Sequence, residues 1–568
     1  MARITRTGSS SLEHPRYDLN DENPHRLHWQ VAKNEYIAFQ LIIRRTNRHA
    51  PKFFSVQSSE SQLPINLFQS HYIRVDNAGY TWGPQTTVLP YPDLYPDALI
   101  PARHGCLDRS KILFDNIDLP RPGANQSVWI EIYIPDNTTT GVHNATIEIK
   151  LDSTTLQLPI MFDVINARLP HEPSIDAVAE LYRTYQLEGV GTQRSSPQWQ
   201  DMAQCYQQLA HQHRMVFMER FPNAPQSKAD WQSYRQAFGP ALTGELFTAD
   251  FGYSGTGYGT PVGVWRTPWP QQYDIEITET LDESAIVQWT TLAKSWQAQI
   301  DKNGWDIPHQ FAYVFDEVDG PSHQSEQDPD RRAYITRAHE NMRKVQTAID
   351  QGADGIDLLW TSHSDPSIWQ TDDQTTLEGT IRLWSPNAHA ANVEFLSNRM
   401  AMGERAWFYH SGHPAVGGHS INLPGSDMRS WGVIGARYSF NGQLMWAANL
   451  GSDRWPFSQP SYKPDDDRVG NGVLVYPGNQ LEKIGFPTAP GPLPSMRLKT
   501  WRRGLQDAEL FFLAMKRDPE KSQALIRELI PLALGEAVAA GAAEPTWSDD
   551  ARAWIEWRDE LLTILAGS

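Results

Sequence analysis

The hydrophobic period changes near residue 170, and this change most limits the folds open to the chain. Residues from about 25 to 165 form short runs of alternating apolar and polar positions between turn clusters. In "VWIEIYIP" (128–135) the β-branched residues face one way, while Trp129, Glu131 and Tyr133 face the other. A period of two is typical of half-buried strands. We therefore expect an N-terminal antiparallel β-sandwich in residues 1–168.

After the linker "LPHEPS" (169–174), helical stretches alternate with continuously apolar runs that end in polar or aromatic residues. This pattern is typical of parallel strands buried on both faces. Six such runs are candidate strands: 215–220, 309–317, 355–363, 380–387, 405–412 and 442–449. Between about 223 and 275 the spacing fails, which predicts an elaborated loop over a cleft.

These patterns predict a multidomain β plus α/β protein. We expect a central (β/α)8 TIM-like catalytic barrel in residues 169–496, with its site at the carboxyl ends of the strands. The remaining residues, 497–568, turn helical and are expected to pack on the barrel.

Composition narrows the ligand class. The chain has 21 Trp, 20 Tyr and 20 Phe and a formal net charge of −18. Aromatic faces stack on sugar rings, whereas nucleic acids and anionic lipids require a cationic surface, so we expect neither as a partner. No run of 18 apolar residues and no apolar leader occur in the sequence. This predicts a soluble protein, either cytoplasmic or exported with its leader removed.

The two cysteines, Cys106 and Cys205, provide neither a disulfide framework nor a thiolate metal site. Whether they pair with each other is open at this stage. Five histidines gather in the expected barrel mouth, but an HExxH motif is missing and the "HSGH" spacing does not arrange metal ligands. We expect no metal and no cofactor. The five are His363, His389, His410, His413 and His419.

The strongest local signal is "FAYVFDEVDGP" (311–321), where an apolar run ends in Asp316 and Glu317. Neighbouring buried carboxylates favour one protonated and one ionised group, as acid–base catalysis requires. Adjacent residues on a regular strand face opposite ways, so both serve one substrate only if the strand bends or stops there. The following Asp319-Gly320-Pro321 predicts such a stop. The alternative is a structural role in a salt bridge or helix cap.

Three segments resemble the family 123 glycoside hydrolases and the related bacterial proteins with domain of unknown function 4091. They are "AKNEYIAFQLII" (32–43), "YVFDEVDGP" (313–321), and "GNGVLVYPG" (470–478) followed by "GPLPSMRLKTWRRGLQDAELF" (491–511). The resemblance implies a retaining, substrate-assisted hydrolase of β-linked N-acetylhexosamine such as GalNAc, in which the acetamido oxygen attacks the anomeric carbon. Carried over by position, Asp316 orients the acetamido group and Glu317 is the acid/base. The partner is an oligosaccharide or glycoconjugate.

Polar and aromatic residues at the ends of the candidate strands are expected to bind the sugar. They are Trp360, His363, Trp384, Asn387, Trp407, Tyr409, His413 and Trp446. Two alternatives stay open: a glycosidase for sugars without an acetamido group, with Asp427 or Glu404 as a second carboxylate, and a noncatalytic glycan-binding protein. The oligomeric state, including a homodimer, is open as well.

Overall fold

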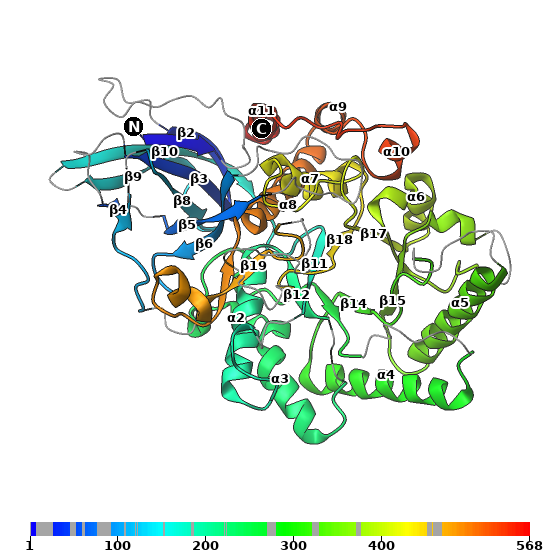
Figure 1. The fold of residues 1–568 in the computed structure, drawn as a ribbon. Helices are drawn as coiled ribbons and strands as arrows, with labels where there is room; N and C mark the ends of the chain where they lie inside the picture. The colour runs from blue at the N-terminus through cyan, green and yellow to red at the C-terminus, as the bar shows by residue number, and fades with distance from the viewer. Residues whose placement is uncertain are drawn as a thin grey trace.

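The computed structural model describes most of the 568-residue chain. Described are residues 2–6, 27–45, 53–59, 63–76, 93–106, 110–119, 121, 123–151, 154–182, 187–220, 222, 224–269, 280–320, 329–370, 376–450, 457 and 469–567. Figure 1 shows a β-rich unit, coloured blue to cyan, beside a ring of strands and helices, with the last helices in red.

The N-terminal unit contains two five-stranded sheets, in the orders β1-β3-β8-β5-β6 and β2-β10-β9-β4-β7. Their strands are β1 (Ala2–Arg6), β2 (Leu27–Lys33), β3 (Glu35–Arg44), β4 (Phe53–Ser59), β5 (Ile65–Val75), β6 (Asp93–Pro101), β7 (Ile117–Asp118), β8 (Asn125–Ile134), β9 (Gly141–Leu151) and β10 (Thr154–Arg168). One apolar core lies between the sheets, where Trp29 stacks on Phe39 of the opposite sheet at 5.5 Å. These two sheets around one core support the expected sandwich in part.

Two details of the sandwich differ from expectation. The edge strand β2 runs parallel to β10, with Trp29 opposite Phe162, so the sandwich is not antiparallel throughout. No hairpin joins these distant strands, and the local sequence pattern therefore does not set their direction. Strand β8 is buried on both faces, because the face that carries Trp129 and Glu131 packs against residues of the following unit.

The second unit is a nearly closed barrel of eight parallel strands in the order β12-β11-β18-β17-β16-β15-β14-β13. The strands are β11 (Asp176–Leu181), β12 (Val216–Glu219), β13 (Val264–Arg266), β14 (His309–Ala312), β15 (Ile356–Ser362), β16 (Leu383–Pro386), β17 (Arg405–Tyr409) and β18 (Gly442–Met445). Pairing of β18 with β11 closes the ring on one side. The two edge strands of this sheet are β12 and β13. Among the described residues no backbone ladder joins them, and we call the place where they meet the seam.

Helices connect the barrel strands and lie outside them (Figure 1). They are α2 (Pro197–Gln212), α3 (Lys228–Leu242), α4 (Glu283–Asn303), α5 (Pro329–Asp350), α6 (Val393–Ala401) and α7 (Gly425–Arg437), and α8 (Met496–Met515) follows the last barrel strand. Between β15 and β16 the described residues contain only the 3-10 turn η4 (Pro366–Trp369). A two-stranded ribbon, β19 (Val475–Pro477) and β20 (Pro492–Pro494), precedes α8.

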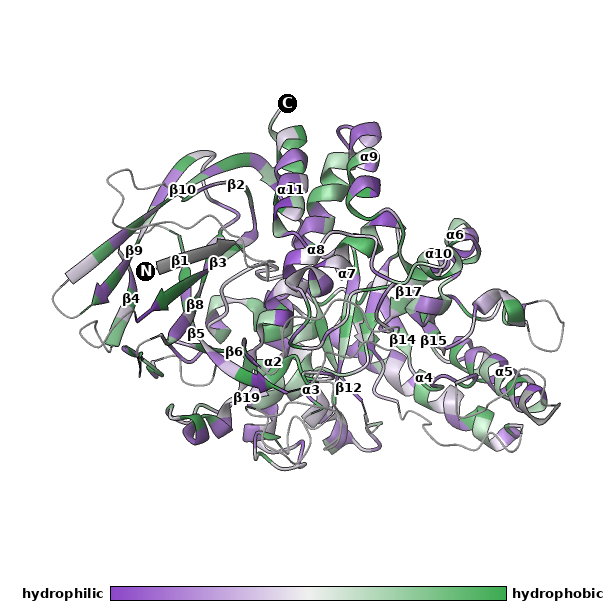
Figure 2. Cartoon of the chain, turned by 45° about the horizontal axis from the view of Figure 1, so that its top comes forward, coloured by the Kyte–Doolittle hydropathy of each residue, from purple (hydrophilic) through white to green (hydrophobic). Residues whose placement is uncertain are grey.

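The C-terminal region is helical, as expected, with α9 (Pro519–Leu529), α10 (Leu534–Ala539) and α11 (Ala551–Ala566). Figure 2 shows hydrophilic and hydrophobic residues mixed along α11, as expected of a helix with one buried face. That face carries Trp554, Leu561 and Leu565. None of the described helices is long and apolar enough to cross a membrane.

All six candidate barrel strands exist, although each is shorter than its apolar run. Strand β11 was not expected because it directly follows the linker. Helix α3 and strand β13 were not expected because the surrounding segment is rich in Gly, Pro and aromatic residues. The expectation of a loop throughout 223–275 is therefore wrong for 228–242 and 264–266. Residues 270–275 of that segment lie outside the described residues.

Candidate active site

Asp316 lies just beyond the carboxyl end of β14, at the mouth of the barrel. Its Oδ1 accepts hydrogen bonds from Tyr313 Oη at 2.5 Å and from Thr361 Oγ1 at 3.3 Å. Its Oδ2 accepts from Arg220 Nη2 at 2.9 Å. Three donors, one of them a guanidinium, fix the orientation of this carboxylate.

Glu317 follows with a left-handed backbone, at φ 43°. Such a conformation is uncommon for a residue with a Cβ and is held only where the surrounding structure determines it. Two bonds hold it here: Glu317 N donates to Thr361 Oγ1 at 3.1 Å, and Gly320 N donates to Glu317 O at 2.7 Å. The strand pleat is broken at this residue, so the two adjacent carboxylates both meet partners at the carboxyl ends of barrel strands.

His363 and Tyr409 flank the carboxylate of Glu317. His363 Nε2 lies 2.9 Å from Glu317 Oε2. Burial acts to lower the pKa of His363, but the hydrogen bond and the charge of Glu317, with Asp319 and Asp316, outweigh it and raise this pKa above its usual value. Burial and then the charge of Glu317 raise the pKa of Tyr409, which stays a neutral donor. Both partners therefore help to hold the Glu317 carboxylate in place.

Asp319 has a structural role at the mouth. It is 2% exposed and accepts hydrogen bonds from Ser362 Oγ at 2.5 Å, His363 N at 3.1 Å and Ser364 N at 3.0 Å. These bonds attach the turn after β14 to the end of β15. They hold His363 where it meets Glu317.

Glu180, on β11, is a site residue that the sequence analysis missed. It is fully buried and forms ion pairs with Arg220 and Arg266, and Arg220 in turn bonds to Asp316. Burial, joined by the charge of Asp316, raises the pKa of Glu180 to about 7 against the opposing pull of the two arginines. A glutamate inside the apolar run "DAVAEL" was the available signal, because a charge in a buried strand requires a partner.

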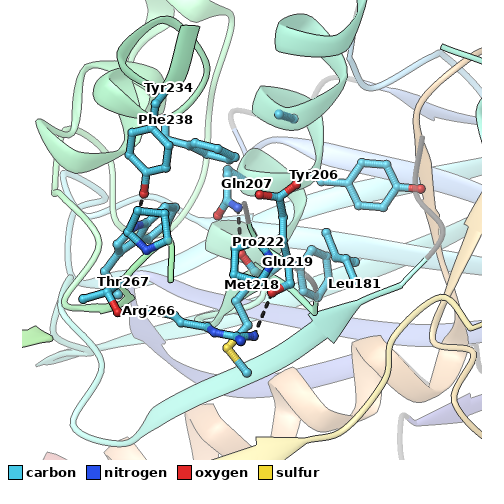
Figure 3. A pocket seen from close by; sticks show the side chains of 14 residues that line it. Leu181, Tyr206, Gln207, Met218, Glu219, Pro222, Tyr234, Phe238, Arg266 and Thr267 are labelled. Carbon is cyan, nitrogen blue, oxygen red and sulfur yellow. Dashed lines mark hydrogen bonds between the residues drawn. The ribbon is translucent and has the colours of Figure 1, made fainter. Parts of the chain in front are cut away.

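The seam between β12 and β13 adjoins this network, because Arg266 of β13 pairs with Glu180. Figure 3 shows the side chains that line the pocket at the seam. There Arg266 Nη1 donates to Glu219 O at 2.8 Å, and Trp265 Nε1 donates to Tyr234 Oη at 2.8 Å. The cavity left at the seam measures about 30 Å³. This is room for a single water molecule, so the seam is not a substrate site.

Two more of the expected sugar-binding residues, Trp446 and Asn387, lie at the same end of the barrel as Asp316 and Glu317. Trp446, at the end of β18, is half-buried and meets Tyr182 edge to face at 6.1 Å, while Arg220 lies 5.3 Å over the Tyr182 ring. Asn387 follows β16 and bridges to Tyr409 through the backbone. Both residues therefore stand at the same mouth as Asp316.

The other expected sugar-binding residues lie in the protein interior. Trp360, Trp384 and Trp407 are 0–1% exposed, and their rings pack on other aromatic or cationic side chains. His413 is 2% exposed, and its Nε2 lies 2.6 Å from Asp427 Oδ2. Protein atoms cover these four side chains, so we do not propose them as sugar contacts.

The described residues contain no group of three His, Cys, Asp or Glu side chains that could hold a metal ion. Within the "HSGH" segment, His410 instead stacks on Trp431 at 5.7 Å, and His413 pairs with Asp427. Cys106 and Cys205, whose pairing the sequence left open, form a disulfide with their Cα atoms 5.8 Å apart.

Comparison with known proteins points to one family. Residues 286–514 match the model of the glycoside hydrolase 123 catalytic domain, a range that includes Asp316, Glu317 and all but the last residue of α8. The structure is similar to that of a family 123 glycoside hydrolase from Clostridium perfringens, described in a study of glycolipid glycan hydrolysis. The identity is 14% and the TM-score 0.61, over 100% of this chain and 98% of that one.

Two other solved structures give lower TM-scores. A GH53 catalytic domain from Ignisphaera aggregans matches with 11% identity and a TM-score of 0.32, over 59% of this chain and 97% of that one. A Bacteroides uniformis β-glucuronidase gives 9% identity and a TM-score of 0.29, over 91% and 50%. No curated protein matches.

The family 123 match thus covers the part of the chain that carries the adjacent carboxylates, and the similar fold extends over the whole chain. Residues 286–514 of this chain are therefore similar to the catalytic domain of the family 123 glycoside hydrolases, enzymes that act on glycans.

Proposed function

We propose that this chain is a retaining, substrate-assisted glycoside hydrolase that cleaves β-linked N-acetylhexosamine, with GalNAc as the favoured sugar. The left-handed backbone of Glu317 carries the proposal, because it lets two consecutive carboxylates serve one sugar. An acetamido group next to the anomeric carbon needs two neighbouring protein groups and no enzyme nucleophile.

Asp316 orients the acetamido group. Its carboxylate has about four lone-pair positions, and Tyr313, Thr361 and Arg220 occupy three of them. The fourth accepts the acetamido N–H, which turns the acetamido oxygen toward the anomeric carbon. Arg220 anchors Asp316 through a charge-assisted hydrogen bond.

Glu317 moves the proton. As the acetamido oxygen bonds to the anomeric carbon, the glycosidic bond breaks and the leaving oxygen takes a proton from Glu317. The ring-fused oxazolinium intermediate then reacts with water, which gives its proton to Glu317 as the new bond forms. The anomeric configuration is retained because the carbon is attacked twice, from opposite faces.

The positions of Glu404 and Asp427 do not favour the alternative mechanism, in which one of them is a second catalytic carboxylate. Glu404 precedes β17 and so lies at the amino end of the barrel, opposite the mouth, where it pairs with Arg399. Asp427 is 2% exposed and bonds to His413 and Gly418 N. Neither carboxylate is available to a sugar at Asp316.

Initial rates on aryl glycosides of β-GalNAc, β-GlcNAc, β-Gal and α-linked sugars test the proposal, with Glu317→Gln and Asp316→Asn beside the wild type. We expect cleavage of the β-acetamido sugars only. Glu317→Gln should lower the rate about 10²–10⁴-fold with a phenyl leaving group. The loss should be far smaller with a dinitrophenyl leaving group, which needs no acid. Asp316→Asn should lower the rate by similar factors with both leaving groups.

Cleavage of β-Gal at a comparable rate would contradict substrate assistance and favour a mechanism with two separated carboxylates. Sugar binding by calorimetry with no turnover of any substrate would favour the noncatalytic alternative. Full activity of Glu317→Gln on the phenyl glycoside would remove this residue as the acid.

A further inference from the structure

A cavity of about 540 Å³ lies between the sandwich and the barrel helices. Strands β5 and β8 line it from the sandwich, and α2, α8 and β20 line it from the other unit. Because α2 and α8 lie outside the barrel strands, the strand wall separates this cavity from Asp316 and Glu317. Its volume is in the range of small-molecule binding sites, which measure roughly 300–1,000 Å³.

Three buried charged side chains line the cavity: Glu131 from β8, and Lys499 and Arg502 from α8. Their exposed fractions are 1%, 4% and 3%. Lys499 Nζ lies 2.6 Å and 3.2 Å from the two oxygens of Glu131, and Arg502 pairs with the same carboxylate. Two cations thus share one anion, which leaves a local positive charge in a chain of net charge −18.

The neighbouring histidine responds to this charge. Burial, and then the charges of Lys499 and Arg502, hold the pKa of His213 well below its usual range. At the edge of the cavity the exposed Arg103 and Asp115 carry opposite charges and cancel. The described lining therefore keeps its one excess positive charge.

Both cations retain hydrogen-bonding capacity. A lysine ammonium has three donors and a guanidinium five, more than the bonds to Glu131 use. The Lys499 ammonium also lies 4.6 Å over the Phe68 ring, and the Arg502 guanidinium lies 4.0 Å over the Tyr36 ring. These rings hold the cations in place and reduce the cost of ordering them when an anion binds.

The rest of the lining combines apolar surface with hydroxyl and amide groups, the mixture that recognises a polyhydroxylated ring. The apolar members include Leu67, Phe114, Leu209 and Pro492, and the polar members include Tyr133, Asn66, Gln57, Gln208, Gln212 and Ser254.

We propose that this cavity is a second, noncatalytic site that binds an acidic sugar, with the sugar carboxylate at Lys499 and Arg502 and the ring against the apolar and amide groups. The proposal goes beyond the hydrolytic function and does not depend on its outcome, since binding here is measured without turnover.

Isothermal titration calorimetry of the full chain with sodium D-glucuronate tests the site, with D-glucose and inorganic sulfate as the neutral-ring and ringless-anion comparisons. We expect glucuronate to bind at least tenfold more tightly than either. Lys499→Met should weaken glucuronate binding about tenfold or more, because one charge-assisted hydrogen bond is lost, and Lys499→Arg should restore most of it. The matched control is Lys521→Met, whose side chain pairs with Glu560 at the surface, and it should bind like the wild type.

Asn66→Asp provides a variant that does not disturb a buried pair, since Asn66 is an exposed residue of the lining. The new carboxylate should repel glucuronate and weaken binding several-fold, while hydrolysis at Asp316 and Glu317 is unchanged. Equal affinity for sulfate and glucuronate would reduce the site to an anion site and overturn the proposal. Glucuronate binding that both variants leave intact, or that cannot be detected in the wild type, would also overturn it.

Discussion

At the scale of single residues, the site depends on a chain of charges that runs from Glu180 through Arg220 to Asp316. The last of these carboxylates faces the substrate mouth, and the first is buried in the barrel. Such a chain fixes the orientation of Asp316 without using its remaining lone pair. Glu180 therefore acts as a positioning residue.

Glu180→Ala is expected to lower the free energy of unfolding by about 3–5 kcal/mol, because Arg220 and Arg266 would lose their shared buried partner. Glu180→Gln should cost less, since the amide oxygen still accepts a hydrogen bond. Urea unfolding measures both. The control is Glu560→Ala, which breaks a surface pair and should cost under about 1 kcal/mol. A similar small cost for Glu180→Ala would contradict the positioning role.

His363→Gln is expected to remove from the kcat/KM pH profile the limb that belongs to the histidine. The raised pKa of His363 keeps its positive charge beside Glu317 to higher pH than in a free imidazole. This charge is lost as the pH rises through the raised pKa, and glutamine does not titrate there. His143→Gln, in strand β9 of the sandwich, should leave the profile unchanged. An unchanged profile for His363→Gln would show that the charge of His363 does not act on the reaction.

At the scale of elements, the packing of α7 against α8 places the C-terminal motif on the barrel. Gly432 and Gly504 lie where these helices meet, and a Cβ on Gly504 would overlap the backbone of Arg429. Glycine lets the two backbones approach. From α8, Arg503 then reaches Glu35 of the sandwich at 2.8 Å and Asp507 on its own helix at 2.8 Å.

Gly504→Ala should therefore destabilise the protein by about 1–3 kcal/mol, although alanine is the better helix former. Gly239→Ala in α3 is the matched control, because the nearest atoms to its Cβ are 3.9 Å and 4.0 Å away. That variant should be neutral or up to about 1 kcal/mol more stable. Thermal unfolding measures the stability of both variants. Equal changes in stability would argue against a close crossing of α7 and α8.

The sequence predicted the elements with strong periodicity better than the contacts between them. The apolar runs located six barrel strands, and "FAYVFDEVDGP" located Asp316 and Glu317, because buried strands must be apolar and charges at their ends are conspicuous. The left-handed Glu317, the parallel β2–β10 pair and the partner of Glu180 depend on residues distant in sequence. Local patterns do not encode such contacts. For the same reason, strand-end position did not separate the buried Trp360 from the half-buried Trp446.

At the scale of the whole molecule, buried charges join the sandwich to the α8 and α11 helices. Glu35 pairs with Arg503 and Arg558, Asp97 pairs with Arg497, and Glu131 pairs with Lys499 and Arg502. Glu35 is the first residue of β3, and Asp97 and Glu131 lie within β6 and β8. The division at residues 168 and 496 stays a prediction, but these pairs favour cooperative unfolding of the parts it separates.

The Cys106–Cys205 disulfide joins the sandwich unit to helix α2 of the barrel across a sequence separation of 99 residues. A double Cys106→Ser, Cys205→Ser variant is expected to lose about 2–4 kcal/mol of stability, because the unfolded chain gains freedom. Denaturant unfolding with and without reductant measures this loss, and reductant should bring the wild type to the variant's stability and leave the variant unchanged. Equal stability of oxidised wild type and variant would contradict the link.

The central claim is that Asp316 and Glu317 work on one sugar whose own acetamido oxygen is the nucleophile. The most direct test measures kcat/KM for aryl β-GalNAc substrates whose N-acetyl group carries zero, one, two or three fluorine atoms. Fluorine withdraws electrons from the acetamido oxygen, so the account predicts a steep fall in rate with each atom added. A rate that is independent of fluorine content would contradict it, because a protein nucleophile or an activated water molecule would then attack the sugar.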